Sequence, residues 1–176
     1  MITLITGGAR SGKSAYAESR AEQHEHVVYI ATANANGDEE MIRRISAHKN
    51  RRPASWRTVE RDHDLAEAIE GEDAALLDCV TVMLSNYLWK HSVDEEVIDE
   101  EKIENLCMEE LRDLIASARR KDCNLFIVTN EVGSGIVPMH PTSRAFRDMQ
   151  GRINQRLAQA ADEVYACISG IPVKIK

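Results

Sequence analysis

The distribution of apolar and polar residues along the 176-residue chain predicts strands that are followed in turn by helices. Short apolar runs between polar segments are typical of strands buried on both faces, whereas apolar residues repeating every three or four positions are typical of helices with one buried face. The apolar runs predict strands at 2–6, 27–31, 56–59, 74–78, 125–129, 164–168 and 171–175. The helical repeats and start signals predict helices at 14–25, 39–50, 64–70, 81–90, 103–118 and 146–160.

This order of elements predicts an α/β fold. Strands that alternate with helices form parallel sheets covered by helices on both faces, which gives three layers. The last two strands are separated only by Ser169 and Gly170, residue types that favour the tight turn of a β-hairpin. Pro172 is tolerated on an edge strand. We therefore expect a mostly parallel sheet with one antiparallel C-terminal edge strand. Without a repeat or linker in the pattern, we expect a single domain over residues 1–176.

The first strand leads into a glycine-rich motif, Gly7-x-x-x-x-Gly12-Lys13-Ser14, which a helix follows. This is the phosphate-loop pattern in its expected context. Backbone N–H groups of such a loop surround a phosphate, the lysine reaches the β and γ phosphates, and the serine hydroxyl binds Mg²⁺. A chance Lys-Ser after an ordinary glycine turn is the alternative, which the flanking strand and helix disfavour. The motif predicts a phosphate-loop NTPase fold and nucleoside triphosphate binding by Gly7, Gly8, Ala9, Arg10, Ser11, Gly12, Lys13 and Ser14.

A candidate metal ligand, Asp78, directly follows the apolar run 74–77. In phosphate-loop proteins an aspartate at the end of such a strand completes the Mg²⁺ site. Ordinary turn chemistry also places Asp after a strand. Beside a phosphate loop, the metal role is the stronger interpretation, so the predicted Mg²⁺ ligands are Ser14 and Asp78.

Charge is unevenly distributed along the chain. The net charge is −7 and the isoelectric point is about 5.4, which argues against broad nucleic-acid binding, because that depends on a basic face. Between residues 43 and 61, however, seven cations stand with Glu60 as the only acid. Beside a phosphate loop this cluster indicates a second anion-binding surface, although a solvated helix face would have the same composition.

The four cysteines are widely spaced and show no zinc or redox spacing. They predict reduced core thiols in a cytoplasmic protein. The N-terminus lacks the layout of a signal peptide, and no apolar run is long enough to cross a membrane. We therefore expect no membrane insertion.

The motifs together resemble the bifunctional adenosylcobinamide kinase and adenosylcobinamide-phosphate guanylyltransferase family of coenzyme B12 assembly. The resemblance covers almost the whole chain, and its later motifs are more specific than the phosphate loop. The residues that carry it include Gly7–Ser14, Ile30–Ala33, His48-Lys49, Arg52-Pro53, Trp56–Glu60, Leu76–Cys79, Val128–Gly133 and Gly170–Lys174.

The resemblance implies two reactions: phosphorylation of the aminopropanol hydroxyl of adenosylcobinamide with ATP or GTP, and transfer of GMP from GTP to adenosylcobinamide phosphate. It implies His48 as the residue that carries GMP, with His48 and Lys13 as catalytic residues, and a homotrimer as the assembly. The neighbouring cations would disfavour the imidazolium form of His48 and keep it neutral. Beyond the phosphate loop, the resemblance implies nucleotide contacts from Ala31, Thr32, Ala33, Lys49, Asn50, Arg51, Arg52, Glu60 and Asp78.

The same residues are compatible with two other functions. One is a simpler phosphate-loop kinase for another alcohol, in which His48 is structural. The other is a nucleotide-dependent binding module that hydrolyses GTP slowly and responds to a protein partner. The loop at 130–138, with its glycines and Glu131, is either a substrate-facing loop or a plain connector.

Overall fold

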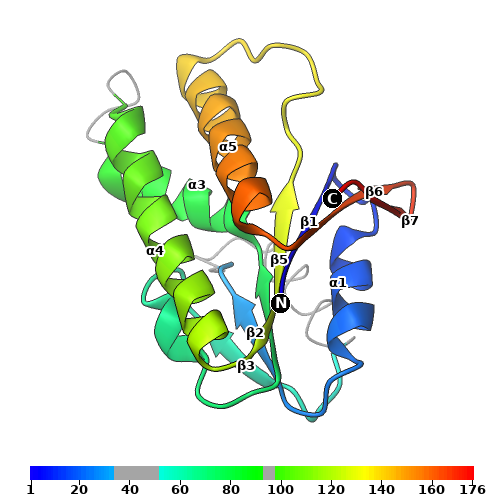
Figure 1. Ribbon diagram of the computed structural model, residues 1–176. Helices are drawn as coiled ribbons and strands as arrows, with labels where there is room; N and C mark the ends of the chain where they lie inside the picture. The colour runs from blue at the N-terminus through cyan, green and yellow to red at the C-terminus, as the bar shows by residue number, and fades with distance from the viewer. Residues whose placement is uncertain (34–51, 93–97) are drawn as a thin grey trace.

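The computed structural model describes residues 1–33, 52–92 and 98–176. Within these residues, seven strands form one sheet in the order β3-β2-β4-β5-β1-β6-β7 (Figure 1). Neighbouring strands are parallel except for β6 and β7, which pair antiparallel at the C-terminal edge. This confirms the predicted sheet. The strands are β1 (Ile2–Gly7), β2 (Val27–Ala31), β3 (Arg57–Glu60), β4 (Ala74–Asp78), β5 (Asn124–Asn130), β6 (Glu163–Ile168) and β7 (Ile171–Lys174).

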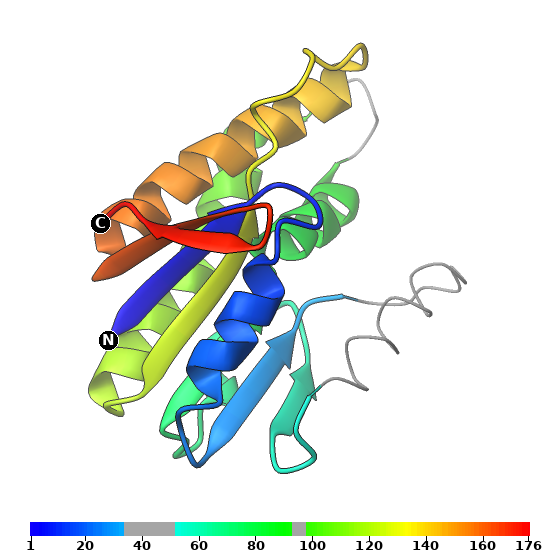
Figure 2. The same ribbon diagram turned by 90° about the vertical axis from the view of Figure 1, so that its right-hand side faces the viewer.

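Helices cover both faces of the sheet, which confirms the three predicted layers. α1 (Lys13–Ala21) lies on one side, and α3 (Val80–His91), α4 (Glu100–Arg120) and α5 (Pro141–Ala160) lie on the other (Figures 1 and 2). The side chains between the sheet and the helices form one buried apolar cluster on each face. Strands buried on both faces have to be apolar throughout, which explains the continuous runs in the sequence.

The position of β1 determines where the glycine motif lies. β1 sits between β5 and β6, and its last residue, Gly7, is in register with Asn130 and Cys167. The loop that follows therefore starts at the carboxyl edge between two other strands, and this is the edge where open parallel sheets bind their ligands.

Several helix boundaries differ from the predicted ones. α1 ends at Ala21 rather than at residue 25, because the following residues are polar and have no face to bury. The stretch predicted as a helix at 64–70 is a single 3₁₀ turn, η1 (Leu65–Ala68), after which Ile69 is extended. α5 begins at Pro141, five residues before the predicted start, because proline is tolerated in a first turn that has no apolar repeat. The helix predicted at 39–50 lies outside the described residues.

All four cysteines are buried free thiols, as predicted. In the described ranges, no helix has the length and apolar character needed to span a bilayer.

The central strand should be sensitive to truncation. Leu4 of β1 is buried under the helices, so Leu4→Ala leaves a cavity and should lower the free energy of unfolding by about 2–5 kcal/mol. Ile136 is 96% exposed, and Ile136→Ala should change it by less than about 0.5 kcal/mol. Urea denaturation followed by circular dichroism measures both, and equal losses would contradict the assignment of β1 to the core.

Candidate functional site

The glycine motif folds back on itself at the end of β1. Arg10 and Gly12 adopt left-handed backbone conformations, with φ of 57° and 90°. Lys13 is buried, and its Nζ donates to the carbonyl oxygen of Gly8 at 3.1 Å. The ammonium thus lies inside the turn of the loop, close to the backbone N–H groups at the start of α1. This is the arrangement with which phosphate loops hold a triphosphate.

The turn between β6 and β7 closes against this loop (Figure 2). The N–H of Gly170 donates to the carbonyl oxygen of Ser11 at 2.9 Å. A Cβ on Gly12 would lie 3.0 Å from Gly170 Cα, and a Cβ on Gly7 would lie 2.6 Å from the carbonyl oxygen of Cys167. Both glycines are therefore required by close backbone contacts as well as by phosphate access. The sequence indicated Gly170 as a hairpin residue and as part of a family motif, but its contact with the phosphate loop was missed.

Asp78 ends β4 at the same edge of the sheet. The hydroxyl of Tyr29, on neighbouring β2, donates to Asp78 Oδ2 at 2.6 Å. Burial raises the pKa of Tyr29, and the negative charge of Asp78 raises it further, against an opposing effect of Arg52. Tyr29 therefore keeps its proton and acts as a hydrogen-bond donor that orients the carboxylate. No sequence motif predicts this contact between Tyr29 and Asp78.

The oxygen atoms available at this edge suit a hard divalent cation. Asp78 is two strands from β1, about 10 Å at the usual strand spacing, and Ser14 stands one residue after Lys13 in α1. A carboxylate and a hydroxyl are the ligands that Mg²⁺ uses beside nucleotide phosphates, which complete its shell. The part of the chain that the structure describes contains no cluster of three His, Cys, Asp or Glu side chains that would hold a metal without a nucleotide.

The charge of Lys13 also reaches the start of α3. Burial raises the pKa of the Cys79 thiol to about 12, and the nearby charge of Asp78 adds to this, whereas Lys13 acts in the opposite direction. The same lysine opposes the burial that raises the pKa of Cys167. Both thiols thus remain protonated at neutral pH. Neither thiol is therefore suited to act as a nucleophile.

Thr32 fixes the ends of β2 and β4 to each other. Its Oγ1 donates to the carbonyl oxygen of Cys79 at 2.8 Å and accepts from the Cys79 N–H at 2.9 Å. Asn86 of α3 donates to the carbonyl oxygen of Thr32 and to Asp62 Oδ2, both at 2.9 Å. These hydrogen bonds fix the backbone next to Asp78. Thr32, which the sequence predicts as a nucleotide contact, therefore also stabilises the structure of the site.

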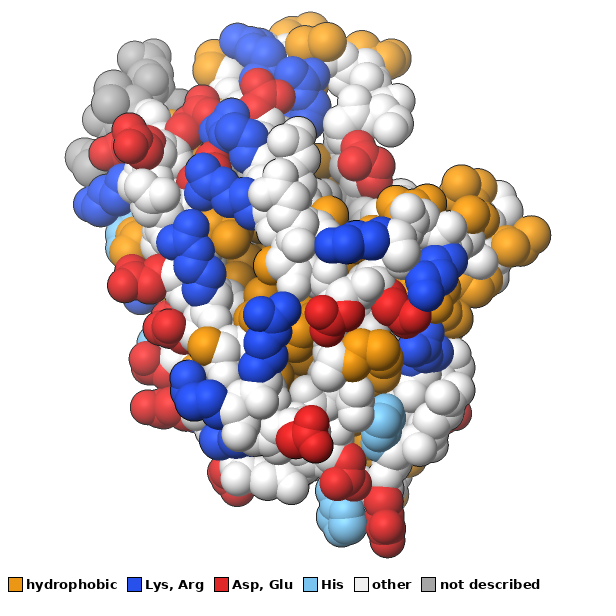
Figure 3. All heavy atoms as spheres, in the orientation of Figure 1, with side chains coloured by type: hydrophobic (Ala, Val, Ile, Leu, Met, Phe, Trp, Pro, Cys, Tyr) orange, Lys and Arg blue, Asp and Glu red, His pale blue; other side chains and the backbone are white. Residues whose placement is uncertain are grey.

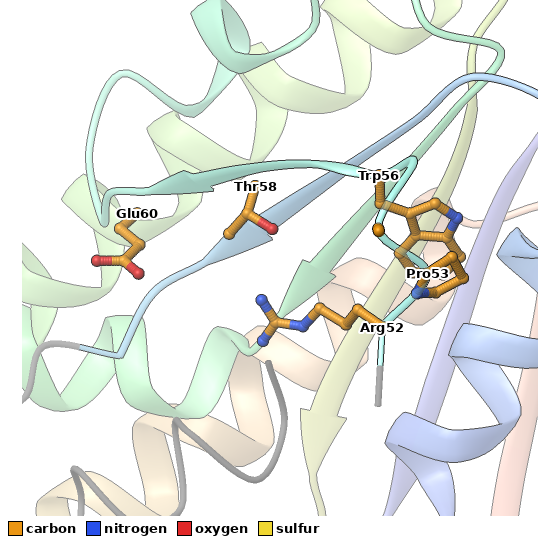
Figure 4. Close-up of a pocket in the computed structure, with 6 residues that line it drawn as sticks. Arg52, Pro53, Trp56, Thr58 and Glu60 are labelled. Carbon is orange, nitrogen blue, oxygen red and sulfur yellow. The ribbon is translucent and has the colours of Figure 1, made fainter. Parts of the chain in front are cut away.

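A hollow of about 500 Å³ lies beside β3 and is lined by Arg52, Pro53, Ala54, Trp56, Thr58 and Glu60. Figure 4 shows the Arg52 guanidinium extending into the space beside Thr58 and Glu60. The guanidinium carbon of Arg52 lies 3.3 Å from the centre of the Tyr29 ring, and Trp56 stacks on the same ring at 6.5 Å. Two predicted nucleotide contacts, Arg52 and Glu60, therefore share one hollow that is linked to Asp78 through Tyr29.

The predicted cationic cluster is only partly described. Arg57 forms an ion pair within the protein, because its Nε donates to Glu72 Oε1 at 2.7 Å. Arg61 donates to the carbonyl oxygen of Asp64 at 2.9 Å and lies 3.4 Å from Glu67. Arg52 is the described member that enters the hollow. The predicted nucleophile and its neighbours lie outside the described residues: His48, Lys49, Asn50 and Arg51.

Comparison with known proteins gives a family for this arrangement. The model of the family described as cobinamide kinase / cobinamide phosphate guanyltransferase matches residues 3–175. The chain belongs to this family. The chain is 46% identical to the bifunctional adenosylcobalamin biosynthesis protein CobU of Salmonella typhimurium strain LT2, and the comparison covers all of both chains. It is 41% identical to the protein CobP of Pseudomonas aeruginosa with the same description, covering all of this chain and 98% of that protein.

Among solved structures, the chain is similar to a KaiC-like protein, PH0186, from Pyrococcus horikoshii OT3. The TM-score is 0.47 at 13% identity, over 94% of this chain and 71% of that one. A likeness at this level carries no argument about function.

Replacing Gly12 should disable the loop while the sheet still folds. Gly12→Ala places a Cβ 3.0 Å from Gly170 Cα and forces an L residue into the left-handed region, at a cost of about 1–2 kcal/mol. The loop must shift, and we expect the affinity for GTP to fall at least about tenfold. Calorimetric titration with GTP and Mg²⁺ measures this effect.

The matched control is Gly71→Ala. Gly71 lies away from the loop, and a Cβ there has no heavy atom within 4 Å. This variant should bind GTP like the natural protein. A Gly12→Ala protein with unchanged affinity would show that the contact with Gly170 does not shape the phosphate site.

Proposed function

We propose that this chain phosphorylates the aminopropanol hydroxyl of adenosylcobinamide with ATP or GTP and then transfers GMP from GTP to the resulting phosphate. The observation that carries the proposal is a buried phosphate-loop lysine, Lys13, at the carboxyl edge of the sheet in a chain that matches the family model over residues 3–175. We propose one domain, residues 1–176, for both activities, which the family match over residues 3–175 supports.

In the first reaction the substrate hydroxyl oxygen bonds to the γ-phosphorus of the nucleotide. The bond from that phosphorus to the bridging oxygen breaks, the nucleoside diphosphate leaves, and the hydroxyl proton is released to solvent. Lys13 and the loop N–H groups stabilise the charge that moves to the bridging oxygen. Ser14 and Asp78 would hold Mg²⁺, which supplies further positive charge at the phosphates when it is bound. Tyr29 keeps the Asp78 carboxylate oriented.

In the second reaction a neutral imidazole nitrogen of His48 attacks the α-phosphorus of GTP and pyrophosphate leaves. The phosphate of the substrate then attacks the same phosphorus, which frees His48 and yields the GDP-linked product. The described part of the nucleotide site supports this route, because Arg52 and Glu60 line one hollow. We propose that they contact the nucleotide together with Ala31, Thr32, Ala33, Lys49, Asn50 and Arg51.

The mass of the intact protein after incubation with GTP and Mg²⁺ tests the covalent step. The natural protein should gain the mass of one GMP through an acid-labile bond, because a phosphoramidate hydrolyses in acid. His48→Ala should gain nothing, while it still binds GTP through the phosphate loop. Adenosylcobinamide phosphate should discharge the label from the natural protein.

Two outcomes would contradict the proposal. A protein that binds GTP but never gains mass would lack the guanylyl step and would act as a phosphate-loop kinase alone. A label that persists in His48→Ala would place the nucleophile elsewhere. His140 provides a matched control, since His140→Ala removes a histidine at the first turn of α5 and should leave the label intact.

We further propose that the chain forms a homotrimer in the cytoplasm. The C-terminal edge carries apolar side chains, Ile168, Ile171, Val173 and Ile175, that are between 45% and 65% exposed. Figure 3 shows apolar side chains gathered at the right-hand edge, where β6 and β7 lie in Figure 1. An exposed apolar edge strand invites pairing with another chain, and a neighbouring subunit would cover it. Four buried free thiols support a reducing compartment.

Charges on this edge should separate the subunits. Ile171→Lys together with Val173→Lys places two cations where a neighbour would pack, and light scattering after gel filtration should show loss of the trimer mass. Ile136→Lys changes an equally apolar exposed residue away from this edge and should remain trimeric. Retention of the trimer by the β7 variant would assign the interface to another surface.

A further inference from the structure

An apolar groove lies between the last turn of α3, the start of α5 and the loop at 131–140. It encloses about 370 Å³, and its lining includes Leu88, Trp89, Val132, Pro138 and Phe146. The loop adds strongly exposed apolar side chains beside it: Ile136 at 96% and Met139 at 88%. Trp89 itself is 72% exposed. Figure 3 shows apolar side chains at the top of the molecule, over the loop between β5 and α5.

Exposed side chains of this size are costly to leave in water. Scattered single residues need no explanation, but an apolar surface around a groove marks a place where a ligand or partner binds. The volume of the groove falls in the range of small-molecule sites.

The groove opens from the same edge of the sheet as the phosphate loop. Gly7 is in register with Asn130, and the N–H of Glu131 donates to the carbonyl oxygen of Gly7 at 3.0 Å. The N–H of Asn130 in turn donates to Thr81 Oγ1 at 2.9 Å. Ser85, which lines the groove, is one helical turn further along α3 than Thr81, about 6 Å at 1.5 Å per residue. The loop that begins beside the phosphate site thus forms one wall of the groove.

We propose that this groove binds the corrin ring of the cobinamide substrate, an inference that rests on the proposed function. A corrin is a broad, flat macrocycle whose faces are apolar and whose rim carries neutral carboxamide groups. The exposed ring of Trp89 and the side chains of the loop suit such a face. The aminopropanol arm extends from the rim, so a ring in the groove directs the hydroxyl toward the phosphate loop.

The polar lining suits neutral amides. Ser85 and Ser143 bring hydroxyl groups, which can donate to and accept from carboxamides. Arg147 is the one charged residue in the described lining, and its Nε already donates to Asp148 Oδ1 at 2.9 Å. No described lining residue therefore calls for an anionic ligand, which separates this groove from the nucleotide sites around Lys13 and Arg52.

Steady-state kinase assays with adenosylcobinamide test the assignment. Trp89→Ala should raise the KM for adenosylcobinamide about tenfold or more, since it removes an aromatic face from the ring, and leave kcat and the KM for the nucleotide unchanged. Trp89→Phe keeps an aromatic face and should stay close to the natural protein. Gel filtration of both variants shows whether the assembly is intact.

Fluorescence gives a readout that needs no turnover. The two tryptophans differ sharply, because Trp89 is 72% exposed and Trp56 only 8%. Iodide should quench Trp89, and adenosylcobinamide without nucleotide should protect it from iodide. In Trp89→Phe the iodide-sensitive emission should be absent.

The outcomes separate this inference from the proposed function. A natural protein that binds nucleotide but does not phosphorylate adenosylcobinamide overturns both. An active enzyme in which Trp89→Ala leaves the KM for adenosylcobinamide unchanged overturns the assignment of the groove alone. A change of subunit number in Trp89→Ala also overturns it, because a second copy of the chain would then be the occupant.

Discussion

The contact between two backbone turns, at Gly12 and Gly170, is the constraint on which the phosphate site depends. A Cβ on Gly12 would stand only 3.0 Å from Gly170 Cα, so the loop keeps its shape only while position 12 lacks a side chain. The bond from Gly170 to Ser11 holds them together. The site is thus built from opposite ends of the chain, and the strand that carries the proposed subunit contact is also the strand that follows this turn.

One buried side chain joins the two halves of the nucleotide site. The ring of Tyr29 contacts Arg52 and Trp56, and its hydroxyl donates to Asp78. The two proposed reactions act on different phosphorus atoms, the γ atom in one and the α atom in the other. A rigid link between the hollow and the sheet edge keeps the groups that serve both reactions in a fixed relation, whichever phosphorus is attacked.

The sequence predicted the sheet and the loop because both depend on local patterns. Buried parallel strands need continuous apolar runs, and the phosphate loop needs its glycines and lysine at fixed spacing. The contact of Tyr29 with Asp78 was not predictable, since it depends on β2 lying beside β4 after a long separation in the chain. Charge counting likewise could not distinguish Arg57, which is paired with Glu72, from Arg52, which enters the hollow. The early start of α5 at Pro141 was missed because its first turn has no apolar repeat.

The order of strands has a consequence for how the protein is made. β1 leaves the ribosome before both of its neighbours in the sheet, β5 and β6, which come much later in the chain. Throughout most of its own synthesis the protein carries a β-branched apolar segment that has no hydrogen-bonding partner, a state in which chains are prone to aggregate. The phosphate loop can make its contact with the β6–β7 turn only when Gly170 has been added. A chain that stops before Gly170 would thus lack both the hairpin and the contact that closes its first motif.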